Sequence, residues 1–199
     1  MSSFGAHAIT MPAPPYEKSL ALVSSANKCL ESTPGLAFII AHRDTLHRQT
    51  HSLCFDVLAH HRHMEEHGQF LYTPPVQVVA ALEQALSLHE QEGGCAARLR
   101  RYQENQSILV QGMRALGFQT TLDDSLFSGI IVSFHIPPPP FAFQTFYDAL
   151  YKKGFLIYHK KTHETGYFRV GCIGQIHAHD MRAFIDSVTS LMPSVVKKR

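Results

Sequence analysis

The sequence predicts a mixed α/β fold made of two parts, residues 1–115 and residues 116–199. Three observations predict this fold class. Two short apolar runs near the start have the length of strands, two long amphipathic segments follow them, and after Gly117 short strand-like and helix-like segments alternate. We therefore expect strands and helices of one domain in the first part and a small α+β domain in the second.

The first part opens with two predicted strands. Residues 1–17 contain three prolines and predict an extended lead-in. The apolar runs 20–23 and 36–41 predict two short buried strands, joined by a turn of small residues that contains Lys28. The segment 52–67 then has apolar residues on one helical face.

Two long helices complete the first part. Thr73 is expected to be the N-cap of the first of them, because Thr is a favoured cap and Pro74 suits the first helical position. This helix should end at Gly93, and the second should run over about 96–116 until Gly117 stops it.

The second part is predicted to contain six short elements. Strands are expected at 118–122, 130–136, 155–158 and 167–172, and helices at 143–153 and 179–191. The four consecutive prolines at 137–140 predict a stiff connector between a strand and a helix.

Composition excludes several classes of function. The net charge is +2 and the basic residues are scattered, so nucleic-acid binding has no support. The four cysteines form no CxxC pair, which favours reduced thiols over a zinc site or a disulfide framework. The apolar runs are too short to span a bilayer, and we expect a cytoplasmic protein that does not contact membranes.

Lys28 is the leading candidate for chemistry. A lysine in a turn between two buried strands would lose part of its hydration, which favours the neutral amine. A neutral amine can attack a carbonyl and form a Schiff base. On spacing alone, a solvated turn lysine with no catalytic role stays open as the alternative.

A histidine cluster suggests a metal site but does not predict one. His60, His63 and His67 would share one face of a helix, as metal ligands could. The order of residues is not the HExxH motif of zinc proteases, and 14 histidines make chance clustering common. We expect an ordinary helix without a metal.

Several segments together resemble the class V, fold-type-I aminotransferases that depend on pyridoxal phosphate (PLP). They are residues 1–5, 24–41, 70–94, 101–118, 146–158 and 168–174. The similarity covers nearly all of this chain but only the C-terminal half of a typical member. It implies that the first part is the end of the large PLP-binding domain and that the second is the small domain.

The resemblance also assigns roles to four residues. It implies that Lys28 bonds to PLP as a Schiff base and moves a proton, and that Asn27 makes a polar contact to the cofactor. Arg169 would grip the substrate carboxylate with its guanidinium fork, although an arginine in a structural ion pair is the alternative. Thr73 would reach the cofactor phosphate of a neighbouring subunit, which requires a homodimer.

Within the group, the match is to enzymes that transfer the amino group of 2-aminoethylphosphonate to pyruvate, which gives phosphonoacetaldehyde and alanine. A related alanine–glyoxylate or serine aminotransferase is an alternative. Another is a catalytically inactive truncated remnant or a dimerisation module.

The resemblance breaks at the start of the chain and at two later places. Met1 aligns with an internal position, so the aspartate that pairs with the pyridine nitrogen, the phosphate loop and the aromatic residue that stacks on the ring would lie upstream. We therefore expect a truncated or split aminotransferase. Ser32 replaces a usual glycine and His159-Lys160 a usual Pro-Gly pair, and these departures bear on which amino donor is used.

Overall fold

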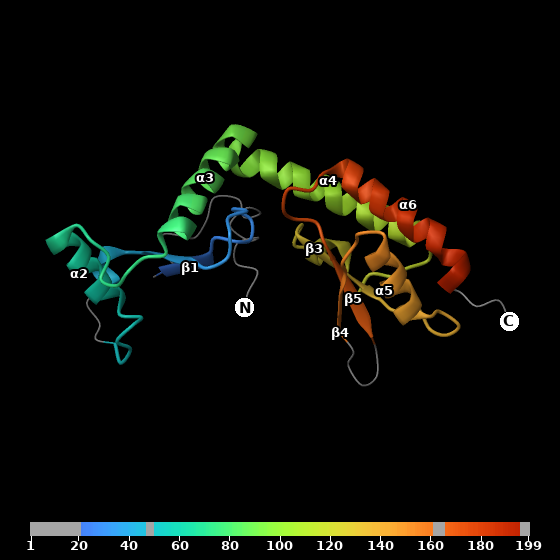
Figure 1. Ribbon diagram of the computed structural model, residues 1–199, viewed down its shortest axis with the longest axis horizontal. Helices are drawn as coiled ribbons and strands as arrows, with labels where there is room; N and C mark the ends of the chain where they lie inside the picture. Colours follow the sequence, from blue (N-terminus) through green and yellow to red (C-terminus); the bar gives the residue numbers. More distant parts are fainter. Residues whose placement is uncertain (1–20, 47–49, 161–165, 196–199) are drawn as a thin grey trace. The chain divides into compact units, whose positions relative to one another are not determined.

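The structure is a computed structural model that describes residues 21–46, 50–160 and 166–195 (Figure 1). The lead-in predicted for residues 1–17 lies outside these ranges. The chain divides into two compact units, Met1–Gln91 and Glu92–Arg199. In the described residues, no helix is long and apolar enough to cross a membrane.

The first unit contains a two-stranded antiparallel sheet and two helices. Its elements are β1 (Ala21–Ser25), β2 (Ala37–Ala41), the short 3-10 helix η2 (Arg43–Thr45), α2 (Val57–His67) and α3 (Val76–Glu92), whose last residue begins the second unit. Both predicted strands are confirmed, and they pair from Ala21–Ala41 to Ser25–Ala37.

The burial predicted for these two strands is wrong. Val23 is 56% exposed and Ile40 64% exposed. Among the described residues no further strand lies beside this two-stranded ribbon, so much of its apolar surface stays in contact with solvent.

Local side-chain chemistry sets where α2 and α3 begin. Asp56 caps α2, because its Oδ1 accepts a hydrogen bond from the Ala59 amide at 2.9 Å, and the helix therefore starts later than predicted. The predicted cap at Thr73 is wrong. The first backbone bonds of α3 go to the carbonyl of Pro75, since a residue followed by proline is pushed out of the helical region.

The second unit packs three helices and a three-stranded sheet. Its elements are α4 (Gly94–Ala115), η3 (Asp124–Leu126), β3 (Ile131–His135), α5 (Phe143–Lys152), β4 (Tyr158–Lys160), β5 (Tyr167–Gly171) and α6 (Ala178–Val195). The sheet order is β3-β5-β4, with both pairs antiparallel, so β5 is the central strand. The predicted strand at 118–122 is only an isolated bridge between Thr120 and Phe134.

One face of this sheet forms the hydrophobic core. Phe134 and Phe168 are fully buried and their rings stack at 5.6 Å. They pack in one cluster with buried residues of all three helices, for example Leu109, Phe146 and Val188. The alternation of side chains along a strand then directs the residues between them to the opposite face.

Helices α4 and α6 lie side by side (Figure 1). Gly112 of α4 allows this approach, because a Cβ added there would lie 2.7 Å from Cγ1 of Ile185. This contact explains why α4 packs in the second unit, although the sequence assigns it to the domain 1–115. That domain boundary stays a prediction about the larger fold.

We expect Gly112→Ala to lower the free energy of unfolding by about 1–2 kcal/mol in urea denaturation, although Ala is the better helix former. The β-branched Ile185 has several atoms within 3 Å of the new methyl group and little rotamer freedom to move away. Ser107→Ala, at an exposed position of the same helix, is the control and should change stability by less than about 0.5 kcal/mol. A stabilised Gly112→Ala variant would contradict the close contact.

Candidate functional site

Lys28 lies in a tight turn between β1 and β2. The amide of Glu31 donates to the carbonyl of Lys28 at 2.9 Å, and the amide of Ser32 donates to the carbonyl of Ala26 at 3.1 Å. Ala26 is fully buried and Cys29 nearly so, which fixes the turn from inside. These contacts direct Lys28 outward, and its side chain is exposed.

The predicted desolvation of Lys28 is therefore wrong for this chain as described. The flanking strands do not enclose the lysine, because their own apolar side chains are exposed. The amine is accessible to a ligand, and the turn holds its backbone in place. Ser32, which stands where the family has glycine, buries its Oγ without a hydrogen-bond partner among the described residues.

Asn27 and Thr73 belong to the same unit as Lys28. Asn27 is half-buried beside the lysine, and Thr73 is exposed three residues before the start of α3. Near Thr73, the hydroxyl of Tyr72 donates to the carbonyl of Leu53 at 3.2 Å and so ties the segment before α3 to the segment before α2. The Thr73 hydroxyl is thus available to a ligand.

Arg169 lies in the middle of β5, on the face of the sheet opposite the core. Its strand neighbours Phe168 and Val170 are both buried in the hydrophobic cluster. Its pairing partners are Ser133 of β3 and Tyr158 of β4. The Nε of Arg169 is buried and has no hydrogen-bond partner among the described residues.

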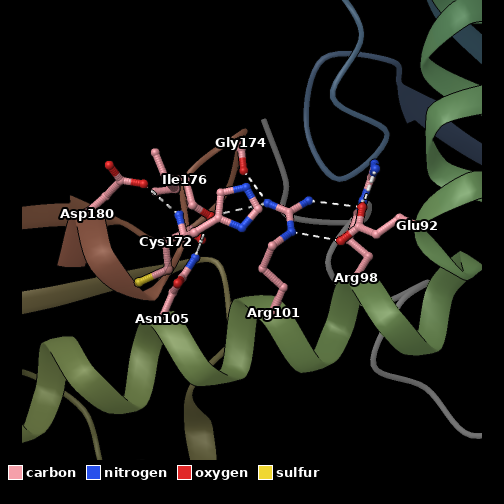
Figure 2. A network of polar contacts seen from close by, with 9 residues as sticks. Glu92, Arg98, Arg101, Asn105, Cys172, Gly174, Ile176 and Asp180 are labelled. Carbon is pink, nitrogen blue, oxygen red and sulfur yellow. Dashed lines mark hydrogen bonds and ion pairs between the residues drawn. The ribbon is translucent and has the colours of Figure 1, made fainter. Parts of the chain in front are cut away.

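A polar network holds the segment that follows β5 against α4 (Figure 2). Arg101 donates to both oxygens of Glu92 and to the carbonyl of Gly174. Arg98, only 1% exposed, bonds the same carboxylate at 2.7 Å. Asn105, fully buried, donates to the carbonyls of Cys172 at 3.2 Å and Ile176 at 2.9 Å.

Two ionisable groups in this region are shifted by their surroundings. The hydrogen bond from Arg101 is the largest cause that lowers the pKa of Glu92 to about 2, and Arg98 adds to it. Burial raises the pKa of the Cys172 thiol to about 12, so this cysteine is not a nucleophile near neutral pH.

We expect Asn105→Ala to lower the free energy of unfolding by about 2–3 kcal/mol, because the buried amide loses its hydrogen bonds to the carbonyls of Cys172 and Ile176. Chemical denaturation measures the change. The matched control is Gln111→Ala, an amide on the exposed side of α4, which should cost less than about 0.5 kcal/mol. Equal effects of the two substitutions would contradict the role given to Asn105.

The histidines of α2 do not converge. His60 contacts the Tyr72 ring at 5.4 Å, and its Nε2 lies 3.1 Å from the carbonyl oxygen of Cys54. His63 and His67 form a separate ring pair at 4.5 Å. Among the described residues, no group of three or more His, Cys, Asp or Glu is placed to hold a metal ion.

The predicted site residues thus fall in both units. Lys28, Asn27 and Thr73 lie in the first unit and Arg169 lies in the second. Sequence reasoning missed the polar network, although Arg98, Arg101 and Asn105 recur at helical spacing along α4, which is a detectable signal.

Comparison with known proteins shows which proteins this chain resembles. No family model matches the chain. A 2-aminoethylphosphonate–pyruvate transaminase from Rhizobium meliloti is 45% identical over 189 residues, which is 93% of this chain and 49% of the relative. This chain is homologous to 2-aminoethylphosphonate–pyruvate transaminases. A transaminase of the same name from Salmonella schwarzengrund is 43% identical over 96% of this chain and 53% of its own length.

The chain spans about half the length of the transaminases it matches. Solved structures agree on the fold. Pyridoxamine–pyruvate aminotransferase from Mesorhizobium loti matches 96% of this chain and 51% of its own, with a TM-score of 0.78 and 19% identity. PLP-bound phosphoserine aminotransferase from Trichomonas vaginalis matches 89% of this chain and 50% of its own, with a TM-score of 0.73 and 17% identity. The predicted α/β aminotransferase fold and the class V resemblance are confirmed.

Proposed function

We propose that this chain supplies the lysine and the arginine of a PLP-dependent aminotransferase that moves the amino group of 2-aminoethylphosphonate to pyruvate. The single observation that carries the proposal is the 45% identity to a transaminase of that name over 93% of this chain. The exposed side chain of Lys28 supports it, as does the buried Nε of Arg169, which has no hydrogen-bond partner in the part of the chain that the structure describes.

The residues present fit the cofactor. Lys28 offers an accessible primary amine on a fixed turn, and Thr73 offers an exposed hydroxyl to a phosphate, while Asn27 lies beside the lysine. PLP, when bound, supplies an electron sink for negative charge at the substrate carbon. The part of Lys28 is to take up and return a proton at Nζ.

Arg169 is proposed to bind the acid group of the substrate. A guanidinium presents parallel N–H donors that match the oxygens of a carboxylate, and it stays charged at every physiological pH. The central strand β5 fixes the backbone of Arg169 on both sides, since β3 and β4 pair with it. A rigid backbone limits the entropy lost when the side chain grips an anion.

Thr73 and the segment around α2 are proposed to face a second subunit in a homodimer, with Thr73 donating to a phosphate in the site of the partner. Leu53 is 82% exposed and Phe55 83% exposed next to this segment, which leaves apolar surface for a partner to cover. We also propose that the protein acts in the cytoplasm.

The test is alanine formation from pyruvate by the purified chain with PLP, alone and mixed with the complementary half of the Rhizobium meliloti relative. We expect 2-aminoethylphosphonate to serve as donor in the mixture, and Arg169→Gln to lower the rate by about a hundredfold or more. Alanine formed from serine but not from the phosphonate would favour the serine aminotransferase, and a reaction that needs glyoxylate would favour the alanine–glyoxylate enzyme.

A second candidate, favoured by the exposed Leu53 and Phe55, is a catalytically inactive dimerisation module. Light scattering with and without a full-length relative tests it. A complex that forms without any gain in alanine production would support the module, and a chain that stays monomeric in both samples would exclude it.

A further inference from the structure

The residues that pair with Arg169 form a row across the sheet. Ser133, Arg169 and Tyr158 lie directly opposite one another on β3, β5 and β4. Directly opposed residues of antiparallel strands project from the same face with Cβ atoms about 5 Å apart. The three side chains therefore share one face.

The contacts of the next row confirm which face this is. His159 pairs with Phe168, and the His159 ring lies 5.6 Å from the ring of Phe143 and 5.1 Å from that of Tyr147, both on α5. His159 and Phe168 thus point toward the helices. Tyr158, the residue before His159, points to the opposite face with Arg169 and is 59% exposed.

The two neighbours of Arg169 differ in reach. Ser133 has a short side chain, which ends in a hydroxyl close to its backbone. Tyr158 is long and exposed, and it ends in a hydroxyl that can donate a hydrogen bond. Neither hydroxyl accepts a hydrogen bond from the buried Nε of Arg169, which has no hydrogen-bond partner in the described part of the chain.

We infer that Tyr158 is a specificity-determining residue that favours a phosphonate over a carboxylate at Arg169. A guanidinium fork donates hydrogen bonds to two oxygens. Both oxygens of a carboxylate then have a donor, whereas the third oxygen of a phosphonate has none. The Tyr158 hydroxyl supplies that donor. This inference rests on the proposed function, because it requires Arg169 to bind the acid group of the substrate.

The test measures anion binding to the chain itself by NMR, through the Nε–H signal of Arg169, which Arg169→Lys assigns. The probes are 2-aminoethylphosphonate and β-alanine, which differ only in the acid group. We expect Tyr158→Phe to weaken the binding of 2-aminoethylphosphonate about tenfold and that of β-alanine less than about twofold. Loss of one hydrogen bond to a charged group predicts a change of this size. Tyr151→Phe, a tyrosine of α5 that is 65% exposed, is the control and should change neither affinity.

The outcomes separate the two proposals. Suppose that both probes shift the Arg169 signal but that Tyr158→Phe weakens the binding of both equally, or of neither. The role of Tyr158 is then overturned, and the role of Arg169 in binding the acid group stands. If neither probe shifts the signal in the unmodified chain, both are overturned.

Discussion

Borohydride reduction in the presence of PLP is expected to leave a pyridoxyl group on Lys28, and Lys28→Ala is expected to lose the label from that peptide completely. The reason is that Lys28 presents its amine from a turn whose backbone is fixed by two hydrogen bonds, with Asn27 adjacent. A primary amine that reaches the cofactor carbonyl forms a bond that borohydride makes permanent. Mass spectrometry of the digested protein locates the label.

Surface lysines also react with PLP, so the experiment needs a matched lysine. Lys152 is exposed near the end of α5 and has no proposed role. Labelling of Lys28 should exceed that of Lys152, and Lys152→Ala should leave the Lys28 label unchanged. Equal labelling of both would mean that Lys28 reacts only as a solvent-exposed amine, which would contradict the cofactor role in this chain.

Glu92→Gln is expected to lower the free energy of unfolding by about 3 kcal/mol near neutral pH. The substitution removes the charge that compensates Arg98, whose side chain is 1% exposed, and weakens the bonds to Arg101. The carboxylate itself is 23% exposed, so solvent screens it little. Urea denaturation followed by circular dichroism measures the change.

The ion pairs of Glu92 with Arg98 and Arg101 also predict how the free energy of unfolding depends on pH. The folded-state pKa of Glu92, about 2, lies below its ordinary value of 4.5. Its stabilisation is therefore fully present above pH 4.5 and is lost as the pH falls toward 2, where the folded-state carboxylate also takes up a proton. The stability difference between the unmodified chain and Glu92→Gln should shrink over this interval.

Glu104 provides the control, because it is an exposed glutamate on α4. Glu104→Gln should change stability by less than about 0.5 kcal/mol at any pH. A difference for Glu92→Gln that does not change between pH 4.5 and pH 2 would show that the carboxylate is not held by the two arginines.

Hydrophobic periodicity predicted β3, β5, α5 and α6 close to where they lie, but the strand predicted at 155–158 overlaps β4 only at Tyr158. The strand predicted at 167–172 is confirmed as β5, in which Phe168 and Val170 lie in the core and Arg169 lies on the other face. Periodicity failed for residues 118–122, because pairing with β3 there reduces to a single bridge at Thr120. A strand needs a partner of sufficient length, which local sequence does not encode.

The errors in the first unit have two physical causes. Thr73 was expected to cap α3 because Thr and Pro are favoured at the start of a helix, but two consecutive prolines delay the helix to Val76. Lys28 was expected to be desolvated because apolar runs flank it. Apolar runs predict strands, but whether another layer covers them depends on tertiary partners. The roles of Lys28, Asn27, Thr73 and Arg169 stay predictions.

The position of β5 between two strands has a consequence for hydrogen–deuterium exchange. Amides of a strand with neighbours on both sides exchange only when the surrounding unit opens as a whole, so the backbone around Arg169 should be among the slowest to exchange. The ribbon of β1 and β2 has one partner for each strand and can fray by itself. The arginine is therefore held in place before any ligand arrives, whereas a ligand at Lys28 must also slow the opening of the ribbon that carries it.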